Sequence, residues 1–297
     1  FIVDDLSTGF RKLINKKSIF FYSSILKKEK IKKIVNNNNI DSIIHLAAAL
    51  SVGESQKNPK KYERINVKGT KNLLVAMKNT NVRNFVFSST CAVYSDGLKK
   101  VSENSNLKPT SVYGKTKLKG ENLIKNFCKK NKINFGILRF FNVAGASDTG
   151  KIGQINKGDQ LFKNLSLETG KKNPIFKIYG TNYKTKDGTC IRDYIHVSDI
   201  SELHFKVLKK IDKTKKSKIL NCGYSKGISV KEVINEFKKY CNKNLKILEH
   251  PRRSGDMVSI ISNNNKLFKF IKWKPKYNKL SLIVKSCLKW EKALSRK

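Results

Sequence analysis

The chain has 297 residues, of which 39% are hydrophobic, so it can bury the core of one large domain or two smaller ones and is not a disordered chain. Its 63 basic and 22 acidic residues give a formal net charge of +41. The lysines are spread over the whole chain and occur with asparagine runs such as 36–39. We therefore interpret the charge as a compositional bias and expect no nucleic acid and no membrane as a partner.

The cysteines are scattered and contain no Cys-x-x-Cys pair. They are Cys91, Cys128, Cys190, Cys222, Cys241 and Cys287. This spacing argues against a zinc site and against a disulfide scaffold. We expect no metal, and a reducing compartment, the cytoplasm, fits best.

The chain opens on an apolar run that is followed by two acids. Phe1, Ile2 and Val3 are typical of the end of a buried strand, and Asp4 and Asp5 come directly after them. Dinucleotide-binding folds hold the adenosine ribose with an acid at this point of a strand. The glycine-rich phosphate loop should lie ~20 residues before that acid, so we expect the loop and the first strand to precede residue 1.

Strand-like and helix-like segments then alternate. The expected helices are 27–38, 67–79 and the segment after Pro109, and the expected strands are 42–46, 84–87 and 136–141. Buried strands joined by helix-length crossovers predict an α/β fold with a Rossmann-like, doubly wound parallel sheet. The hydroxyl cluster at 88–90 follows one of these strands, where such sheets bind ligands.

Past residue 142 the character of the chain changes. The expected elements there are helices near 161–169, 198–210, 229–241 and 281–294 and a strand near 175–179. We predict a Rossmann domain that binds a dinucleotide over 1–142. A smaller substrate-binding domain would occupy mainly 143–297, with a return to the Rossmann sheet near 190–210.

Tyr113 and Lys117 stand four residues apart in the segment after Pro109. In a helix they would lie on one face, one turn apart. A nearby cation favours the phenolate, so Tyr113 could exchange a proton near neutral pH. Because this spacing is common in lysine-rich helices, it predicts chemistry only together with other motifs.

Several motifs occur in a recognisable order along nearly the whole chain. They lie at 3–7, 52–55, 87–90, 113–117, 138–142, 187–189, 192–197 and 252–256. In this order the chain resembles the extended short-chain dehydrogenase/reductases, and among them the branch that epimerises UDP-sugars. The blocks at 187–197 and 252–256 are the most specific for that branch.

The resemblance implies NAD as the cofactor. The residues expected to contact it are Asp4, Asp5, Leu6, Ser7, Ser24, Ile25, Leu46, Ala47, Ala48, Leu50, Asn66, Ser88, Tyr113, Lys117 and Phe141. The acids would hold the adenosine ribose and suit NAD over NADP. Lys117 would bind the nicotinamide ribose and lower the pKa of Tyr113. Ser24 and Leu50 depart from the family pattern, which has an aspartate and a lysine there.

The resemblance also implies a UDP-sugar as the substrate. The residues expected to contact it are Thr90, Tyr113, Asn142, Gln160, Leu161, Lys177, Tyr179, Arg192, Arg253 and Asp256. Arg192 and Arg253 would clamp the diphosphate, for which guanidinium groups are well suited. Lys177 and Tyr179 would flank the uracil. Asn142 would reach a phosphate and Asp256 the uridine ribose.

The implied reaction interconverts UDP-glucose and UDP-galactose. Tyr113 takes the proton of the 4-hydroxyl, which Thr90 hydrogen-bonds, while C4 gives a hydride to NAD; the ketone turns over and the hydride returns, without net redox. Related dehydratases and decarboxylases have an acid directly after the threonine. Cys91 and Ala92 stand there in this chain, which favours simple epimerisation.

Three alternatives stay open at this point. The substrate could be UDP-GlcNAc or UDP-glucuronate. Ile260 falls where the width of the pocket is often set, which leaves acetylated sugars undecided. The chain could also be a non-catalytic protein that binds NAD or associates with nucleic acid. A homodimer through helices near 60–79 and 111–130 is expected from the family alone.

Overall fold

The structure is a computed structural model, and it describes residues 1–297 apart from 96, 98, 157, 242, 254–255 and 296–297. The described residues form two compact units. The first contains 1–93, 111–138 and 204–219, and the second contains 94–110, 139–203 and 220–297. The chain therefore passes between the units several times.

A four-stranded sheet in the order β10-β6-β4-β3 organises the first unit. Its strands are β3 (Ser42–His45), β4 (Asn84–Thr90), β6 (Asn134–Phe140) and β10 (Lys218–Cys222), the last two of which continue into the second unit. β3 and β4 are parallel, with Ile43 opposite Phe85. β1 (Ile2–Asp4) and β2 (Phe20–Tyr22) form a separate parallel pair.

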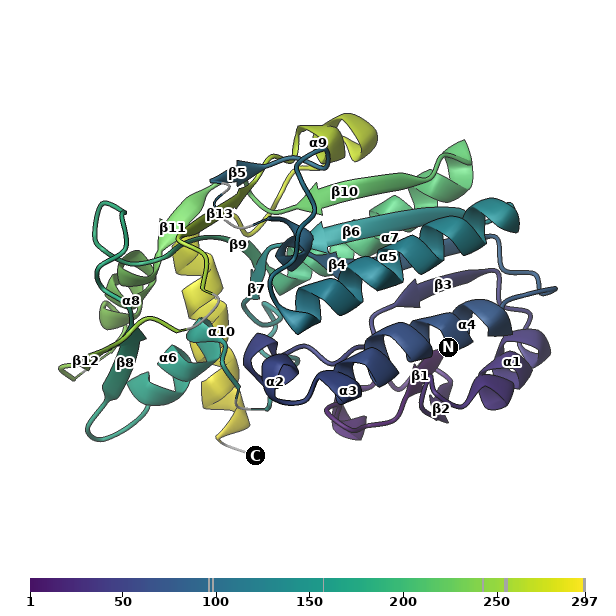
Figure 1. Cartoon of the computed structure of the whole chain (residues 1–297). Helices are drawn as coiled ribbons and strands as arrows, with labels where there is room; N and C mark the ends of the chain where they lie inside the picture. Colours follow the sequence, from purple (N-terminus) through teal and green to yellow (C-terminus); the bar gives the residue numbers. More distant parts are fainter. Residues whose placement is uncertain (96, 98, 157, 242, 254–255, 296–297) are drawn as a thin grey trace. The chain divides into compact units, whose positions relative to one another are not determined.

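Helices cover both faces of the four-stranded sheet. α5 (Val112–Lys130) lies in front of it in Figure 1 and α7 (Val197–Thr214) behind it. Two glycines allow the close approach: a Cβ on Gly120 of α5 would lie 3.3 Å from Phe87, and one on Gly136 of β6 would lie 2.8 Å from Val207 of α7. The predicted doubly wound α/β fold is therefore confirmed.

The remaining helices of the first unit follow its apolar pattern. They are the 3-10 helices η1 (Arg11–Leu13) and η3 (Cys91–Val93), α1 (Lys28–Asn37), α2 (Val52–Lys57), α3 (Pro59–Tyr62), the π-helix η2 (Glu63–Gly69) and α4 (Thr70–Ala76). α1 buries Ile31, Ile34 and Val35, which recur at helical spacing. The helix expected over 67–79 is in fact the end of η2 followed by α4.

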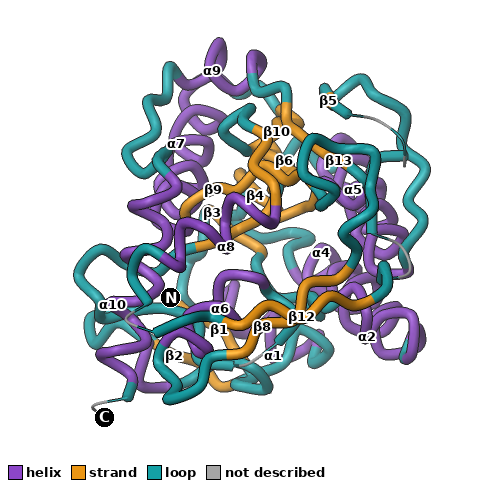
Figure 2. Tube along the Cα trace, turned by 90° about the vertical axis from the view of Figure 1, so that its left-hand side faces the viewer, coloured by secondary structure: helices purple, strands orange, loops and turns teal. Residues whose placement is uncertain are grey.

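The second unit has a sheet in the order β11-β9-β13-β5, to which β7 adds by pairing with β9. These strands are β5 (Lys100–Val101), β7 (Asn142–Ala144), β9 (Ile191–His196), β11 (Gly227–Ser229) and β13 (Ser259–Ser262). β8 (Ile175–Tyr179) and β12 (Lys246–His250) form a separate parallel pair, and Figure 2 shows them side by side.

The helices of the second unit are α6 (Leu161–Thr169), α8 (Val230–Lys238), α9 (Asn265–Ile271) and α10 (Leu280–Leu294). Of these, α6, α8 and α10 pack around an apolar core. Leu165, Val233, Phe237 and Val284 are fully buried in this core. Three of the expected helices, near 161–169, 229–241 and 281–294, are confirmed as α6, α8 and α10.

Three features of the described residues bear on the expected function. None of their helices has both the length and the apolar character that crossing a membrane requires. They contain no cluster of three or more His, Cys, Asp or Glu side chains placed to hold a metal ion. All six cysteines are free thiols.

Candidate active site

The predicted catalytic residues of the first unit lie together at the start of α5. The hydroxyl of Ser111 accepts a hydrogen bond from the backbone of Gly114 at 3.0 Å and so caps the helix. One residue into the helix, the side chain of Tyr113 is hydrogen-bonded to that of Thr90, the last residue of β4. The phenol and the threonine hydroxyl are therefore adjacent.

Two further contacts fix Tyr113. Its backbone N–H donates to the hydroxyl of Ser55 at 3.1 Å. Its ring stands edge-on to that of Tyr62, with the centroids 6.5 Å apart. An aromatic pair of this geometry favours one ring orientation, so the phenol is held in place before any ligand binds.

Lys117 lies one turn further along the same face of α5 and is only 3% exposed. Its ammonium lies over the Phe87 ring, 4.1 Å from the centroid. Burial lowers the pKa of Lys117 to about 7, while the charge of Glu121 acts in the opposite direction. Lys117 is therefore close to the midpoint of its titration at neutral pH.

The pKa of Tyr113 does not move in the direction expected from sequence. Burial raises it to about 12, which the hydrogen bond from Thr90 offsets in part and the neighbouring Cys91 reinforces. Lys117 does not lower it in this structure, because its ammonium faces Phe87 and its own charge is weakened by burial. The prediction of an acidified Tyr113 in the chain by itself was therefore wrong.

Consecutive hydroxyls at the end of β4 point to different partners. Ser88 hydrogen-bonds His204 of α7, with Oγ and Nε2 2.7 Å apart. Ser89 donates to the carboxylate of Glu121 on α5 at 2.5 Å. The alternation of side chains along a strand explains this division. The predicted cofactor residue Ser88 is thus engaged with His204 in this structure.

Five residues predicted to contact the cofactor lie at or just after the ends of β1 and β2. They are Asp4, Asp5, Leu6, Ser7 and Ser24. Asp4 accepts a 2.6 Å hydrogen bond from the backbone of Leu6, which has φ +53. Asp5 accepts from the hydroxyl of Ser7 at 2.6 Å and from that of Ser24. Burial alone would raise the pKa of Asp5, but these hydrogen bonds hold it below its ordinary value.

The segment after β3 carries four more predicted cofactor residues. They are Leu46, Ala47, Ala48 and Leu50. Leu46 and Leu50 are largely exposed. Asn66 of η2 ties this segment down: its amide exchanges two hydrogen bonds with the backbone of Ala49 and donates to Thr116 of α5. Ile25 lies against Gly69 of the same π-helix.

In the second unit, two arginines predicted to bind substrate share one carboxylate. Asp256 accepts from Nε of Arg253 at 3.0 Å and lies 3.7 Å from the guanidinium of Arg192. The guanidinium of Arg253 also lies over the ring of Tyr179, 5.4 Å from its centroid. Lys177 is exposed on the neighbouring part of β8. Residues 254–255 of this motif lie outside the described residues.

The other predicted substrate residues of the second unit lie at the starts of elements. Asn142 begins β7. Phe141, which was predicted to contact the cofactor, directly precedes it, is buried and donates its backbone N–H to the carbonyl of Cys222. Gln160 precedes α6 and Leu161 begins it. Gln160 and Leu161 therefore lie together at one helix end.

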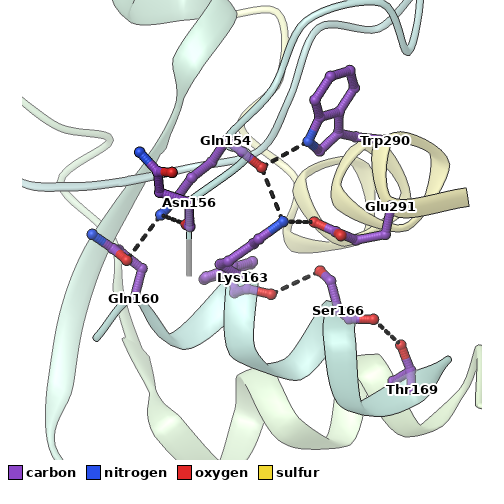
Figure 3. Close-up of polar contacts among 9 residues, drawn as sticks. Gln154, Asn156, Gln160, Lys163, Ser166, Thr169, Trp290 and Glu291 are labelled. Atoms are coloured by element: carbon purple, nitrogen blue, oxygen red, sulfur yellow. Dashed lines mark hydrogen bonds and ion pairs between the residues drawn. The ribbon is translucent and has the colours of Figure 1, made fainter. Parts of the chain in front are cut away.

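A network around Lys163 fixes the segment that precedes α6 (Figure 3). Lys163 pairs with Glu291 of α10 at 2.5 Å and donates to the backbone carbonyl of Gln154 at 3.0 Å. Trp290 donates to the same carbonyl at 2.8 Å. The side chain of Gln154 in turn donates to that of Gln160 at 2.9 Å. α10 thus orients Gln160 through Lys163 and Gln154.

The block 187–197 turns out to hold the second unit together. Asp187 accepts from the backbone and hydroxyl of Thr189 and also from Ser229. Asp193 is buried and accepts from the backbone of Tyr224 at 2.8 Å and of Ser225 at 3.0 Å. These two acids satisfy backbone groups of turns, so both have a structural role in the second unit.

Sequence reasoning missed two residues that interact with Lys117. Phe87 supplies the ring beneath its ammonium, and Glu121 is the charged group that acts on it. The spacing of Glu121, four residues after Lys117, was an available signal, because it places a carboxylate on the same helix face.

Comparison with known proteins agrees with this geometry. The NAD dependent epimerase/dehydratase family matches residues 1–223. The UDP-glucose 4-epimerase of Lactobacillus helveticus is 36% identical over an alignment of 296 residues that covers 98% of this chain and 89% of that protein.

Two solved structures are similar to this chain over most of their length. The UDP-glucose 4-epimerase of Stenotrophomonas maltophila, with bound NAD and formylated UDP-arabinopyranose, has a TM-score of 0.89, 31% identity and coverage of 94% and 84% of the two chains. The UDP-Glc/GlcNAc 4-epimerase of Campylobacter jejuni has a TM-score of 0.83, 38% identity and coverage of 98% and 91%. This chain therefore belongs to the NAD dependent epimerase/dehydratase family.

Proposed function

We propose that this protein interconverts UDP-glucose and UDP-galactose by inverting C4 of the sugar. NAD would be the cofactor and would be regenerated in each turnover. The observation that carries the proposal is the adjacency of Thr90, Tyr113 and Lys117 at the end of β4 and the start of α5. A chain 36% identical to a UDP-glucose 4-epimerase over nearly its full length supports the choice of sugar.

The residues present in the first unit fit NAD. The carboxylate of Asp5 stays ionised, since hydrogen bonds from Ser7 and Ser24 hold its pKa down, and an ionised acid at the end of a strand suits ribose hydroxyls. Asp4 stands beside it at the end of β1. Bound NAD supplies a reversible acceptor for the hydride of C4.

Tyr113 would move the proton of the reaction. Its phenol oxygen takes the proton of the sugar 4-hydroxyl in one direction and returns it in the other. Thr90, hydrogen-bonded to Tyr113, would hold the same sugar oxygen. Because burial disfavours the phenolate, the step needs positive charge near the ring, which the ammonium of Lys117 would supply from the next turn.

The residues after Thr90 favour epimerisation over elimination. Cys91 and Ala92 begin the short helix η3, and neither is a carboxylic acid. An elimination at the sugar needs a further acid–base group beside the threonine. The absence of a carboxylic acid at these two positions suits a reversible oxidation and reduction at C4.

The second unit would bind the nucleotide part of the substrate. Arg192 and Arg253 converge on Asp256, and a diphosphate offers the same guanidinium groups several oxygens in bidentate geometry. Tyr179, beside Arg253, presents a partly exposed ring against which uracil could stack. We assign Asn142, Gln160, Leu161 and Lys177 to the same role from the family pattern.

A second candidate is a broader UDP-sugar 4-epimerase that also accepts N-acetylated sugars. The UDP-Glc/GlcNAc 4-epimerase of C. jejuni is 38% identical to this chain and covers 98% of it. Turnover of UDP-galactose and UDP-GlcNAc by the same preparation, with UDP-glucuronate as a third substrate, decides between the two. Absence of turnover with UDP-galactose would remove our first choice.

The direct test of the proposed function is Tyr113→Phe, which removes the proton-transferring oxygen and keeps the ring. We expect kcat with UDP-galactose to fall by roughly 10²–10⁴-fold, with the Kd for UDP-glucose, measured by calorimetry, nearly unchanged. Tyr240→Phe is the matched control, since Tyr240 lies after α8 in the second unit. Equal activity of both variants would contradict the assignment.

We also infer a cytoplasmic homodimer. The free state of all six cysteines suits a reducing compartment. The dimer follows the family expectation for helices near 60–79 and 111–130. Light scattering on the purified protein measures its mass, and a monomeric mass of 33.9 kDa would contradict the inference.

A further inference from the structure

Glu121 is a buried acid that the proposed proton transfer does not use. Its carboxylate is on α5, four residues after Lys117, and the residue is 0% exposed. A buried carboxylate is costly unless it is hydrogen-bonded and balanced by an opposite charge. We therefore expect the carboxylate of Glu121 to have a hydrogen-bond donor and a cation close to it in the core of the first unit.

β4 supplies the hydrogen-bond donor, Ser89, and α5 supplies the cation, Lys117. Ser89 donates to Oε1 of Glu121 at 2.5 Å. Phe87, two residues earlier on the same face of the strand, carries the ammonium of Lys117 over its ring. The strand thus fixes both members of a lysine–glutamate pair that are one helical turn apart.

We propose that Glu121 is a positioning residue for the reaction: held by Ser89, it keeps the buried ammonium of Lys117 charged and in place while Tyr113 exchanges its proton. This inference rests on the proposed function. Burial drives the pKa of Lys117 down to about 7, and the charge of Glu121 is what opposes that fall. Without Glu121, Lys117 would be neutral at the pH at which Tyr113 needs a cation.

The other titratable groups near Lys117 do not replace Glu121. His45 of β3 is buried and hydrogen-bonded to Thr70, and burial with the charge of Lys117 lowers its pKa to about 3, so it is neutral. Tyr113, on the same helix, is protonated in this structure because burial raises its pKa to about 12. Neither group offers the negative charge that stabilises an ammonium.

The test is Glu121→Gln, which keeps the shape of the side chain and removes its charge. We expect the alkaline limb of the kcat–pH profile to move to lower pH by about one unit or more, so that activity falls several-fold at pH 8 and little at pH 6. Glu121→Asp keeps the charge and should keep the limb. Ser89→Ala should move the limb in the same direction, by less.

A purely structural role would give a different result. It would lower kcat by the same factor at every pH, and that outcome would overturn the inference. If Glu121→Gln does not fold, Ser89→Ala carries the test, and an unmoved limb there is equally decisive. Loss of turnover in the wild-type protein would instead contradict the proposed function, so the two failures are distinguishable.

A second readout does not depend on activity. Proton release by Lys117 makes the unfolding free energy of the wild-type protein depend on pH, and this dependence should extend to lower pH in Glu121→Gln. Identical pH dependence of unfolding in the two proteins would also overturn the inference.

Discussion

Among the described residues, each unit contains one almost fully buried lysine, and the two lysines have opposite kinds of surroundings. Lys163 of the second unit, 5% exposed, meets the carboxylate of Glu291 at 2.5 Å and a backbone carbonyl at 3.0 Å. Lys117 of the first unit, 3% exposed, has its ammonium over an aromatic ring. One lysine has direct hydrogen-bonding oxygens, and the other a ring and a carboxylate one turn away.

This difference distinguishes a lysine that stabilises the structure, Lys163, from a lysine suited to catalysis, Lys117. An ion pair with a short contact and a second acceptor fixes the side chain of Lys163 and joins α6 to α10. The pKa of Lys117 is lowered to about 7 because burial is only partly opposed by Glu121. A lysine whose charge responds to its surroundings is suited to an active site.

The largest expected effect is that of Lys117→Met on turnover. Methionine keeps the apolar stem and removes the cation, so the phenolate of Tyr113 loses its stabilising charge. We expect kcat to fall by roughly 10²–10⁴-fold, while the free energy of unfolding at pH 7 stays the same or rises. Steady-state kinetics and urea denaturation measure the two quantities. A variant that unfolds more easily but turns over normally would reverse the comparison.

Lys163→Met should show the opposite pattern. It leaves Glu291 without its cation and takes one donor from the carbonyl of Gln154. Removing one partner of a buried pair costs about 3–5 kcal/mol, which urea denaturation measures. The double variant Lys163→Met with Glu291→Leu should recover part of this loss, because no buried charge is left alone. Unchanged stability of Lys163→Met would show that the pair is dispensable.

The main features of the first unit could be predicted from local patterns. The alternation of apolar strands with helical segments indicated the parallel sheet, and the spacing of Tyr113 and Lys117 placed both on one face of α5. The acids after β1 were recognisable because an acid at a strand end has a known use. Such features depend on neighbours within a few residues.

Features that depend on burial or on distant partners could not be predicted. The direction of the Tyr113 pKa required knowledge of how deeply the ring is buried. Lys163 and Glu291 are 128 residues apart, and their pairing depends on how α6 and α10 pack. The π-helix η2 could not be predicted from its own residues. Its Asn66 contacts the backbone of Ala49, which lies 17 residues away in the sequence.

The titration of Lys117 should also appear in the stability of the protein. Its folded pKa of about 7 lies below the unfolded value of 10.5, so the unfolded chain binds more protons between these two values and the unfolding free energy rises with pH there. The contribution is up to about 1.4 kcal/mol per pH unit. The contribution of Lys117 to the unfolding free energy is fully present above pH 10.5 and is lost as the pH falls through 7.

Lys117→Met isolates this contribution. The difference in unfolding free energy between wild type and variant should change with pH from 7 to 9.5, in the direction that favours wild type at the higher pH. Other titrating groups cancel in the difference, as the variant retains them. A difference that is constant over this window would show that Lys117 keeps its ordinary pKa in the folded protein.

The smallest expected effect is that of Lys119→Gln, which breaks an ion pair on the outer face of α5. Lys119 lies 3.0 Å from Glu63, but the two side chains are 58% and 50% exposed. Water screens such a pair, and its loss costs roughly 0–1 kcal/mol. We expect normal kcat and a nearly unchanged urea midpoint. Lys119 is two residues from Lys117 on the same helix. A large loss of activity in Lys119→Gln would therefore mean that any change in α5 disturbs the site. The comparison of Lys117 with Lys163 would then no longer show which lysine takes part in catalysis.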